Sequence, residues 1–112
     1  MSQHFFQKKA VFIRDEDFDR LIGEYPLVVV CFVQSRCDLS RRIRPILNQL
    51  ANDYFPQVKV VKIDLAKYKQ IGERFQIDCL PNIFYFKNGQ RMNNLVGLLP
   101  DEVIRNKLEE LL

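Results

Sequence analysis

The pattern of apolar and polar residues predicts one central buried strand followed by one long helix. Residues 27–33 (LVVVCFV) are seven consecutive apolar residues rich in β-branched types, which is typical of a strand buried on both faces of a parallel sheet. After a polar break at 34–36, apolar residues recur at helical spacing as far as Phe55-Pro56, at Leu39, Ile43, Ile46, Leu47, Leu50, Ala51 and Tyr54. Because Pro45 lies inside this helix and cannot donate a backbone hydrogen bond, a kink is expected there.

The same two patterns, apolar runs for strands and apolar residues at helical spacing for helices, predict the other elements. Before the central strand they are a short strand at 11–13 and a helix opened by the acidic residues 15–17, with Phe18, Leu21 and Ile22 inward and Gly23 at its end. After the long helix they are a strand at 58–64, a short helix marked by Tyr68, Ile71 and Phe75, and a strand at 83–86. The chain then continues with a hairpin turn at Asn88-Gly89, a return strand at 91–96, and a final helix opened by Pro100 with Ile104, Leu108 and Leu111 inward. The resulting order is β-α-β-α-β-α-β-β-α, with parallel crossovers first and an antiparallel hairpin later. It predicts an α/β fold with a mixed sheet of four or five strands flanked by four helices.

Length and composition predict a single domain over residues 1–112. A chain of 112 residues with 47% apolar residues can bury a core without the support of disulfides or metals. No apolar run approaches the roughly 18 residues that span a bilayer, and residues 1–10 lack the residue order of a secretory signal. We therefore expect a soluble, cytoplasmic protein that does not bind membranes.

The three cysteines, Cys31, Cys37 and Cys79, contain no CxxC pair. An odd number at these spacings argues against a disulfide framework and against a zinc site, so no metal or other cofactor is expected. The excess positive charge lies around the second cysteine, because residues 36–44 contain four arginines and one aspartate while the remaining charges cancel. No nucleic-acid-binding motif accompanies these arginines, and we interpret them as contributing to partner selection near the thiol.

Several short motifs resemble the thioredoxin family over nearly the whole chain. In chain order they are Phe32, Cys37-Asp38-Leu39-Ser40, Pro45-Ile46-Leu47, Val61-Lys62-Ile63-Asp64, Leu80-Pro81, Phe86-Lys87-Asn88-Gly89 and Gly97. The resemblance implies the thioredoxin fold, with Cys37 at the start of the second helix. It also implies a cis Leu80-Pro81 bond that faces this cysteine.

The chain departs from the family around the expected active site. Ser40 stands where thioredoxins have a second, resolving cysteine, and Arg36 stands where they have a tryptophan. Asp38-Leu39 replaces their Gly-Pro pair, and Cys31 stands where they bury an aspartate. In the family this aspartate is thought to handle the proton of the resolving thiol. The absence of both the aspartate and the resolving cysteine therefore indicates a consistent design with one reactive thiol.

The resemblance implies thiol–disulfide exchange, a reaction of cell redox homeostasis, by one nucleophilic cysteine. Cys37 is the candidate nucleophile, because a helix N-terminus favours a thiolate and the neighbouring arginines are expected to strengthen this effect. Ser40 cannot resolve a mixed disulfide and is a candidate hydrogen-bonding partner of the sulfur. Leu80 and Pro81, together with Arg36, are the candidates for binding an extended peptide. An external thiol such as glutathione would release the mixed disulfides.

The other two cysteines differ in what can be expected of them. Three roles stay open for Cys79, which lies two residues before Pro81: it captures the disulfide left on Cys37, pairs with a second molecule, or has no role. Cys31 lies inside an apolar strand and is interpreted as a buried space-filler without chemical function. The expected partners are proteins that carry disulfides or thiols, and the protein is expected to be a monomer or a dimer linked through Cys79.

Two alternative functions belong to other classes. The first is a non-catalytic adaptor with the thioredoxin fold, which holds partner segments at the Pro81 surface. If the protein is instead an enzyme, we expect at most a monothiol protein-disulfide oxidoreductase. The second is a monothiol glutaredoxin that holds an iron–sulfur cluster. The Cys-x-x-Ser pattern favours the second, but the chain lacks the Cys-Gly-Phe-Ser motif and the Gly-Gly pair of that family, and this alternative ranks last.

Overall fold

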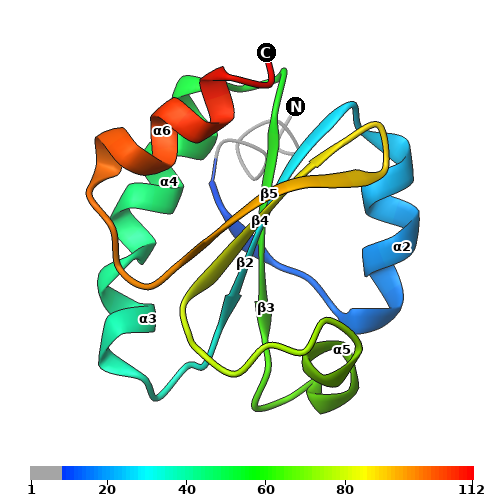
Figure 1. Cartoon of the computed structure of the whole chain (residues 1–112), viewed down its shortest axis with the longest axis vertical. Helices are drawn as coiled ribbons and strands as arrows, with labels where there is room; N and C mark the ends of the chain where they lie inside the picture. Colours follow the sequence, from blue (N-terminus) through cyan, green and yellow to red (C-terminus); the bar gives the residue numbers. More distant parts are fainter. Residues whose placement is uncertain (1–8) are drawn as a thin grey trace.

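The computed structural model describes residues 9–112, and its centre is a five-stranded mixed sheet between two layers of helices (Figure 1). The strands, in spatial order, are β1 (Val11–Phe12), β3 (Lys59–Asp64), β2 (Leu27–Val33), β4 (Asn82–Lys87) and β5 (Gln90–Val96). Strands β1, β3 and β2 are parallel, and β4 runs antiparallel to both β2 and β5. The mixed sheet predicted from the sequence is confirmed, with five strands.

Strand β2 is the centre of the sheet because both of its faces are apolar. Val30 pairs with Val61 of β3 on one side and with Phe84 of β4 on the other, and every residue of β2 is buried. The hairpin that joins β4 to β5 turns at Asn88 and Gly89, whose φ angles are 52° and 82°. Asparagine and glycine adopt this left-handed conformation at low cost, which is why the pair marks the turn in the sequence.

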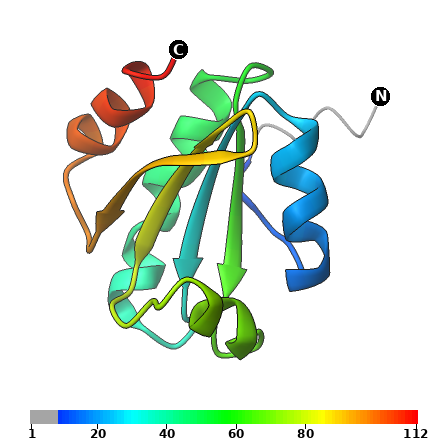
Figure 2. The ribbon, with the colours of Figure 1, turned by 45° about the vertical axis from the view of Figure 1, so that its right-hand side comes forward.

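The helices are α2 (Asp15–Glu24), α3 (Asp38–Arg42), α4 (Arg44–Asp53), α5 (Lys69–Arg74) and α6 (Asp101–Glu109). Figures 1 and 2 show α2 and α5 on one face of the sheet and α3, α4 and α6 on the other. The first face is packed with aromatic rings, among which Phe32 and Phe84 lie 4.9 Å apart between centroids. The second face is aliphatic and includes Cys31. There the buried Tyr85 hydroxyl donates a hydrogen bond of 2.8 Å to the carbonyl of Ile104, which ties α6 to the sheet.

The long helix predicted after β2 is two helices, α3 and α4, that meet at Ile43. Pro45 lies in the first turn of α4, where a missing backbone N–H costs no hydrogen bond. Because a new helix begins at this proline, the helix is broken here, where the sequence predicted only a kink. The prediction was wrong for Leu39, which is 40% exposed, because the apolar stripe of α4 does not continue into α3. It was also wrong by one residue for the first helix, which passes through Gly23 and ends at Glu24.

No helix among residues 9–112 is long and apolar enough to cross a membrane. The same residues contain no group of three or more histidine, cysteine, aspartate or glutamate side chains that could hold a metal ion. The interpretation of residues 1–10 as lacking a secretory signal falls, apart from Lys9 and Ala10, outside the described residues.

Candidate active site

Cys37 is the N-cap residue of α3, directly after the polar loop that leaves β2. Its backbone N–H donates to the carbonyl of Gln34 over 2.9 Å, and its carbonyl accepts the N–H of Arg41 over 3.1 Å. These bonds fix the backbone where the chain enters the helix, beside the first N–H groups that have no partner within the helix. The side chain is partly exposed, so a partner molecule can reach the sulfur.

The surroundings of Cys37 lower the pKa of its thiol. The largest cause is the backbone N–H of Ser40, followed by the Ser40 hydroxyl and, with a smaller effect, the backbone N–H of Leu39. Desolvation and the negative charge of Asp38 act in the opposite direction. Each N–H or O–H group lowers the pKa because it donates to the thiolate more strongly than to the thiol.

The expected contribution of the arginines to this shift is corrected by the structure. The interactions that lower the pKa of Cys37 most come from the first turn of α3 rather than from Arg36, Arg41 or Arg42. Arg41 instead contacts Asp38 at 3.4 Å, and both side chains are exposed. Exposed charges are screened by water, whereas the N–H groups lie against the sulfur. The arginines remain candidates for partner selection.

Ser40 is buried, although it is a polar residue in the first turn of a surface helix. Its Oγ accepts the backbone N–H of Gln34 over 3.1 Å, which holds the hydroxyl over the loop that carries Cys37. A hydroxyl has one hydrogen to donate. Because its oxygen already accepts from Gln34, the hydrogen is available to the sulfur, in agreement with the lowered pKa of Cys37.

Pro81 lies at the same end of the sheet as Cys37. Phe32, next to the end of β2, pairs with Asn82 at the start of the antiparallel β4, so the residue before Asn82 is level with the end of β2. Figures 1 and 2 show the segment before β4 beside the beginning of α3. The Leu80–Pro81 peptide bond is cis.

Leu80 offers backbone groups that a partner could use. The carbonyl of Pro81 accepts the N–H of Gly97 over 2.7 Å, whereas the N–H and C=O of Leu80 form no hydrogen bond with any other residue in the described part of the chain. The Leu80 side chain packs against the aromatic face of the sheet, which holds this backbone in place. An extended peptide can pair with such free backbone groups as it would with a sheet edge.

The remaining site candidates lie at different depths. Arg36 and Cys79 are exposed, whereas Cys31 is fully buried. Burial raises the pKa of Cys31 to about 12, and the nearby charge of Lys62 offsets only part of this effect. A thiol of this kind is neutral at physiological pH and does not attack disulfides, as expected for a space-filling residue.

Sequence reasoning missed the role of Lys62, which entered it only as part of a strand motif. The residue lies on β3 directly beside Cys31 in register, and only 7% of it is exposed. The signal was available, because a lysine between Val61 and Ile63 in a central strand faces the protein interior. What surrounds its ammonium group could not be read from the sequence, because the neighbouring residues come from three other parts of the chain.

Comparison with known sequences gives matches over almost the whole chain. The family model described as Thioredoxin matches residues 9–110. The chain is 30% identical over 102 residues to Thioredoxin 1 of Synechococcus elongatus, covering 90% of this chain and 95% of that protein. It is 29% identical over 99 residues to the chloroplastic M-type thioredoxin of Pisum sativum, covering 88% of this chain and 58% of that protein. The chain thus spans less than two thirds of the length of this chloroplastic relative.

Comparison with solved structures supports the same fold. A mutant thioredoxin from Halobacterium salinarum superposes with a TM-score of 0.86 at 17% identity, covering 94% of this chain and 92% of that one. The thioredoxin of Plasmodium falciparum superposes with a TM-score of 0.81 at 24% identity, covering 90% and 97% of the two chains. At these identities the likeness concerns the fold, which is the thioredoxin fold expected from the sequence motifs.

Proposed function

Because the chain belongs to the thioredoxin family, we propose that it carries out thiol–disulfide exchange through a single nucleophile, Cys37. The observation that carries this proposal is the position of Cys37 at the start of α3, where the N–H and hydroxyl of Ser40 lower the pKa of its thiol. A lowered pKa increases the thiolate fraction at neutral pH, and the thiolate is the species that attacks disulfides.

The exchange proceeds in two balanced steps. The Cys37 thiolate attacks one sulfur of a partner disulfide, so that a new S–S bond forms while the partner's own S–S bond breaks. The second partner sulfur leaves with the electron pair as a thiolate and takes a proton from water. An external thiolate, such as that of glutathione, then attacks the partner sulfur of the mixed disulfide and releases the Cys37 thiolate.

Ser40 explains why an external thiol is needed. In a dithiol enzyme the residue at this position would itself attack the mixed disulfide, but a serine hydroxyl cannot form a disulfide. The buried Ser40 hydroxyl instead stabilises the Cys37 thiolate. The same stabilisation makes Cys37 a better leaving group in the second step. Cys79 is exposed and remains a candidate second thiol.

The partner is proposed to be a protein with an extended segment. The free N–H and C=O of Leu80, just before the cis bond to Pro81, can pair with the backbone of such a segment. The exposed Arg36 directly precedes Cys37 in the chain, and the exposed apolar side chain of Leu39 follows two residues after it; both can contact the side chains of the segment. These contacts would hold a partner disulfide against the sulfur.

Reaction with oxidised glutathione tests the proposal. Intact-mass spectrometry after incubation near neutral pH should show one glutathionyl group on the unaltered protein and on a Cys79→Ser variant, and none on Cys37→Ser. Added reduced glutathione should remove the group. An unmodified protein, or an adduct that persists in Cys37→Ser, would contradict the assignment of Cys37.

An adaptor function is the second candidate, and the free backbone of Leu80 favours it. This backbone can bind an extended peptide whether or not the sulfur beside it reacts. Capture of proteins from a lysate on the immobilised chain separates the two functions. Partners that are released only by reductant, and only when Cys37 is present, support exchange, whereas partners that Cys37→Ser retains equally well support the adaptor.

A further inference from the structure

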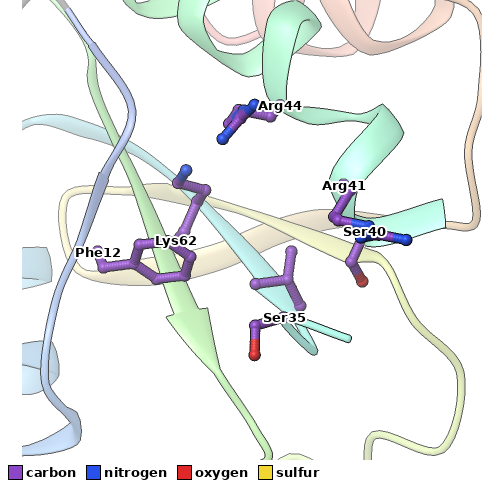
Figure 3. A pocket seen from close by; sticks show the side chains of 7 residues that line it. Phe12, Ser35, Ser40, Arg41, Arg44 and Lys62 are labelled. Atoms are coloured by element: carbon purple, nitrogen blue, oxygen red, sulfur yellow. The ribbon is translucent and has the colours of Figure 1, made fainter. Parts of the chain in front are cut away.

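A pocket of about 200 Å³ lies between the sheet and the α3–α4 helices, next to the thiol site (Figure 3). Its lining includes Phe12, Ser35, Ser40, Arg41, Arg44 and Lys62. These residues come from β1, the loop after β2, the two helices and β3, so only the folded chain brings them together. Val33 of β2 completes the lining; three of the seven residues carry a positive charge, and none of the described residues that line the pocket is an aspartate or a glutamate.

Lys62 is the most informative residue of this pocket. Only 7% of it is exposed, and its ammonium lies 4.3 Å from the centroid of the Phe12 ring. Among the described residues it forms no salt bridge and no side-chain hydrogen bond. Charged side chains are rarely buried to this extent without an opposite charge. Burial lowers the pKa of Lys62, and the charge of Arg44 lowers it further.

Arg44 faces Lys62 from the opposite wall. Figure 3 shows the charged ends of the two side chains directed toward the same space, one from β3 and one from α4. Arg44 forms no salt bridge within the described part of the chain, and Arg41 is paired only with the exposed Asp38 at the helix surface. Two cations therefore repel each other across a pocket to which the described residues contribute no anion.

We propose that this pocket binds a small oxyanion, a phosphate, sulfate or carboxylate group, between Lys62 and Arg44. The ammonium of Lys62 supplies a compact charge, and the guanidinium of Arg44 can donate two parallel hydrogen bonds to two oxygens. The hydroxyl of Ser35 is a further donor on the same lining. A bound anion neutralises the repulsion between the two cations and adds to the contact with the Phe12 ring the opposite charge that Lys62 lacks among the described residues. This site is independent of the proposed exchange reaction, which does not use Lys62 or Arg44.

A titration followed by amide chemical shifts tests the proposal on the whole chain. Inorganic phosphate is added at constant ionic strength, and acetate is used in a second arm. The amides of Phe12, Ser35 and Lys62 should shift in a saturable way. Lys62→Met and Arg44→Gln should each weaken binding by on the order of 10-fold, because each removes a charged hydrogen-bond donor. Arg42→Gln is the matched control, since Arg42 is exposed and does not line the pocket.

The outcomes distinguish specific binding of an anion in the pocket from a nonspecific effect of the protein's positive charge. Saturable shifts that weaken in the two pocket variants and persist in Arg42→Gln establish the site. Tighter binding of phosphate then identifies a phosphoryl-type ligand, and tighter binding of acetate identifies a carboxylate. Linear shifts without saturation, or equal weakening in Arg42→Gln, overturn the proposal. Unchanged spectra of the free variants outside the pocket show that each one is folded.

Discussion

Replacing Ser40 with alanine perturbs two interactions at once. The buried hydroxyl accepts the backbone N–H of Gln34 over 3.1 Å and lowers the pKa of Cys37. Alanine removes both interactions but keeps the backbone N–H at position 40, which is the largest cause of the lowered pKa. The variant therefore separates the contribution of the side chain from that of the helix N-terminus.

The effect of Ser40→Ala on stability follows from the hydrogen bond. A partly buried N–H that loses its acceptor costs about 1–2 kcal/mol, and the higher helix propensity of alanine recovers up to ~0.5 kcal/mol. The free energy of unfolding should fall by about 0.5–1.5 kcal/mol. For a domain of this size that corresponds to a Tm lower by roughly 2–6 °C.

The effect on the thiol has a defined sign. The Ser40 hydroxyl donates to the thiolate, so its removal raises the pKa of Cys37 toward that of a free thiol, although the remaining N–H groups keep it lower. Alkylation by iodoacetamide should be slower than in the unaltered protein at mildly acidic pH, and the two rates should converge at alkaline pH. The measurement is the alkylation rate of Cys37 against pH, in a background where Cys79 is serine.

Ser35→Ala is the matched control, because Ser35 is an exposed serine of the same loop that forms no hydrogen bond with the described residues. It should change neither the Tm nor the pH dependence of alkylation. If Ser40→Ala reacts with the same pH profile as the unaltered protein, the hydroxyl does not stabilise the thiolate. If the Tm also stays unchanged, the hydrogen bond to Gln34 contributes nothing, and the reasoning about Ser40 fails.

Three further predictions follow from the same geometry. Ser40→Cys should raise the rate of insulin disulfide reduction, which stalls at the mixed disulfide in the unaltered chain; rapid turnover of insulin by the unaltered chain, also without Cys79, would contradict the single-cysteine mechanism. Alkylation at mildly acidic pH should label Cys37 first, Cys79 next and Cys31 last; equal labelling of Cys37 and Cys79 would favour the adaptor function. The third concerns Cys31, whose folded-state pKa of about 12 lies above the ~8.5 of an unfolded chain. The unfolded state therefore loses this proton first, and stability should fall above pH ~8.5 by up to ~1.4 kcal/mol per pH unit. The free energy of unfolding, measured by urea titration at a series of pH values, should fall less steeply above pH ~8.5 in Cys31→Val than in the unaltered protein. Equal pH dependence of the two proteins would show that Cys31 does not titrate as described.

The sequence by itself determined the order of the elements and singled out the two residues on which the candidate site is centred. A run of apolar β-branched residues has one favourable environment, the middle of a sheet, so β2 could be assigned from residues 27–33 alone. Asn88-Gly89 fixed the hairpin because few other pairs adopt its backbone angles. Cys37 and Pro81 could be singled out because their motifs lie in short local stretches of sequence.

Tertiary structure decided the properties that depend on residues far apart in the chain. The exposure of Leu39 followed from a break at Ile43 that helical periodicity did not predict. The lowered pKa of Cys37 comes mainly from donors that touch the sulfur, and counting nearby arginines could not reveal them because exposed charges are screened. The cationic pocket exists only where β1, the loop after β2, the helices α3 and α4, and β3 meet. Its chemistry depends on the distances between side chains that are up to 50 residues apart in the chain, from Phe12 to Lys62, and those distances are set by packing.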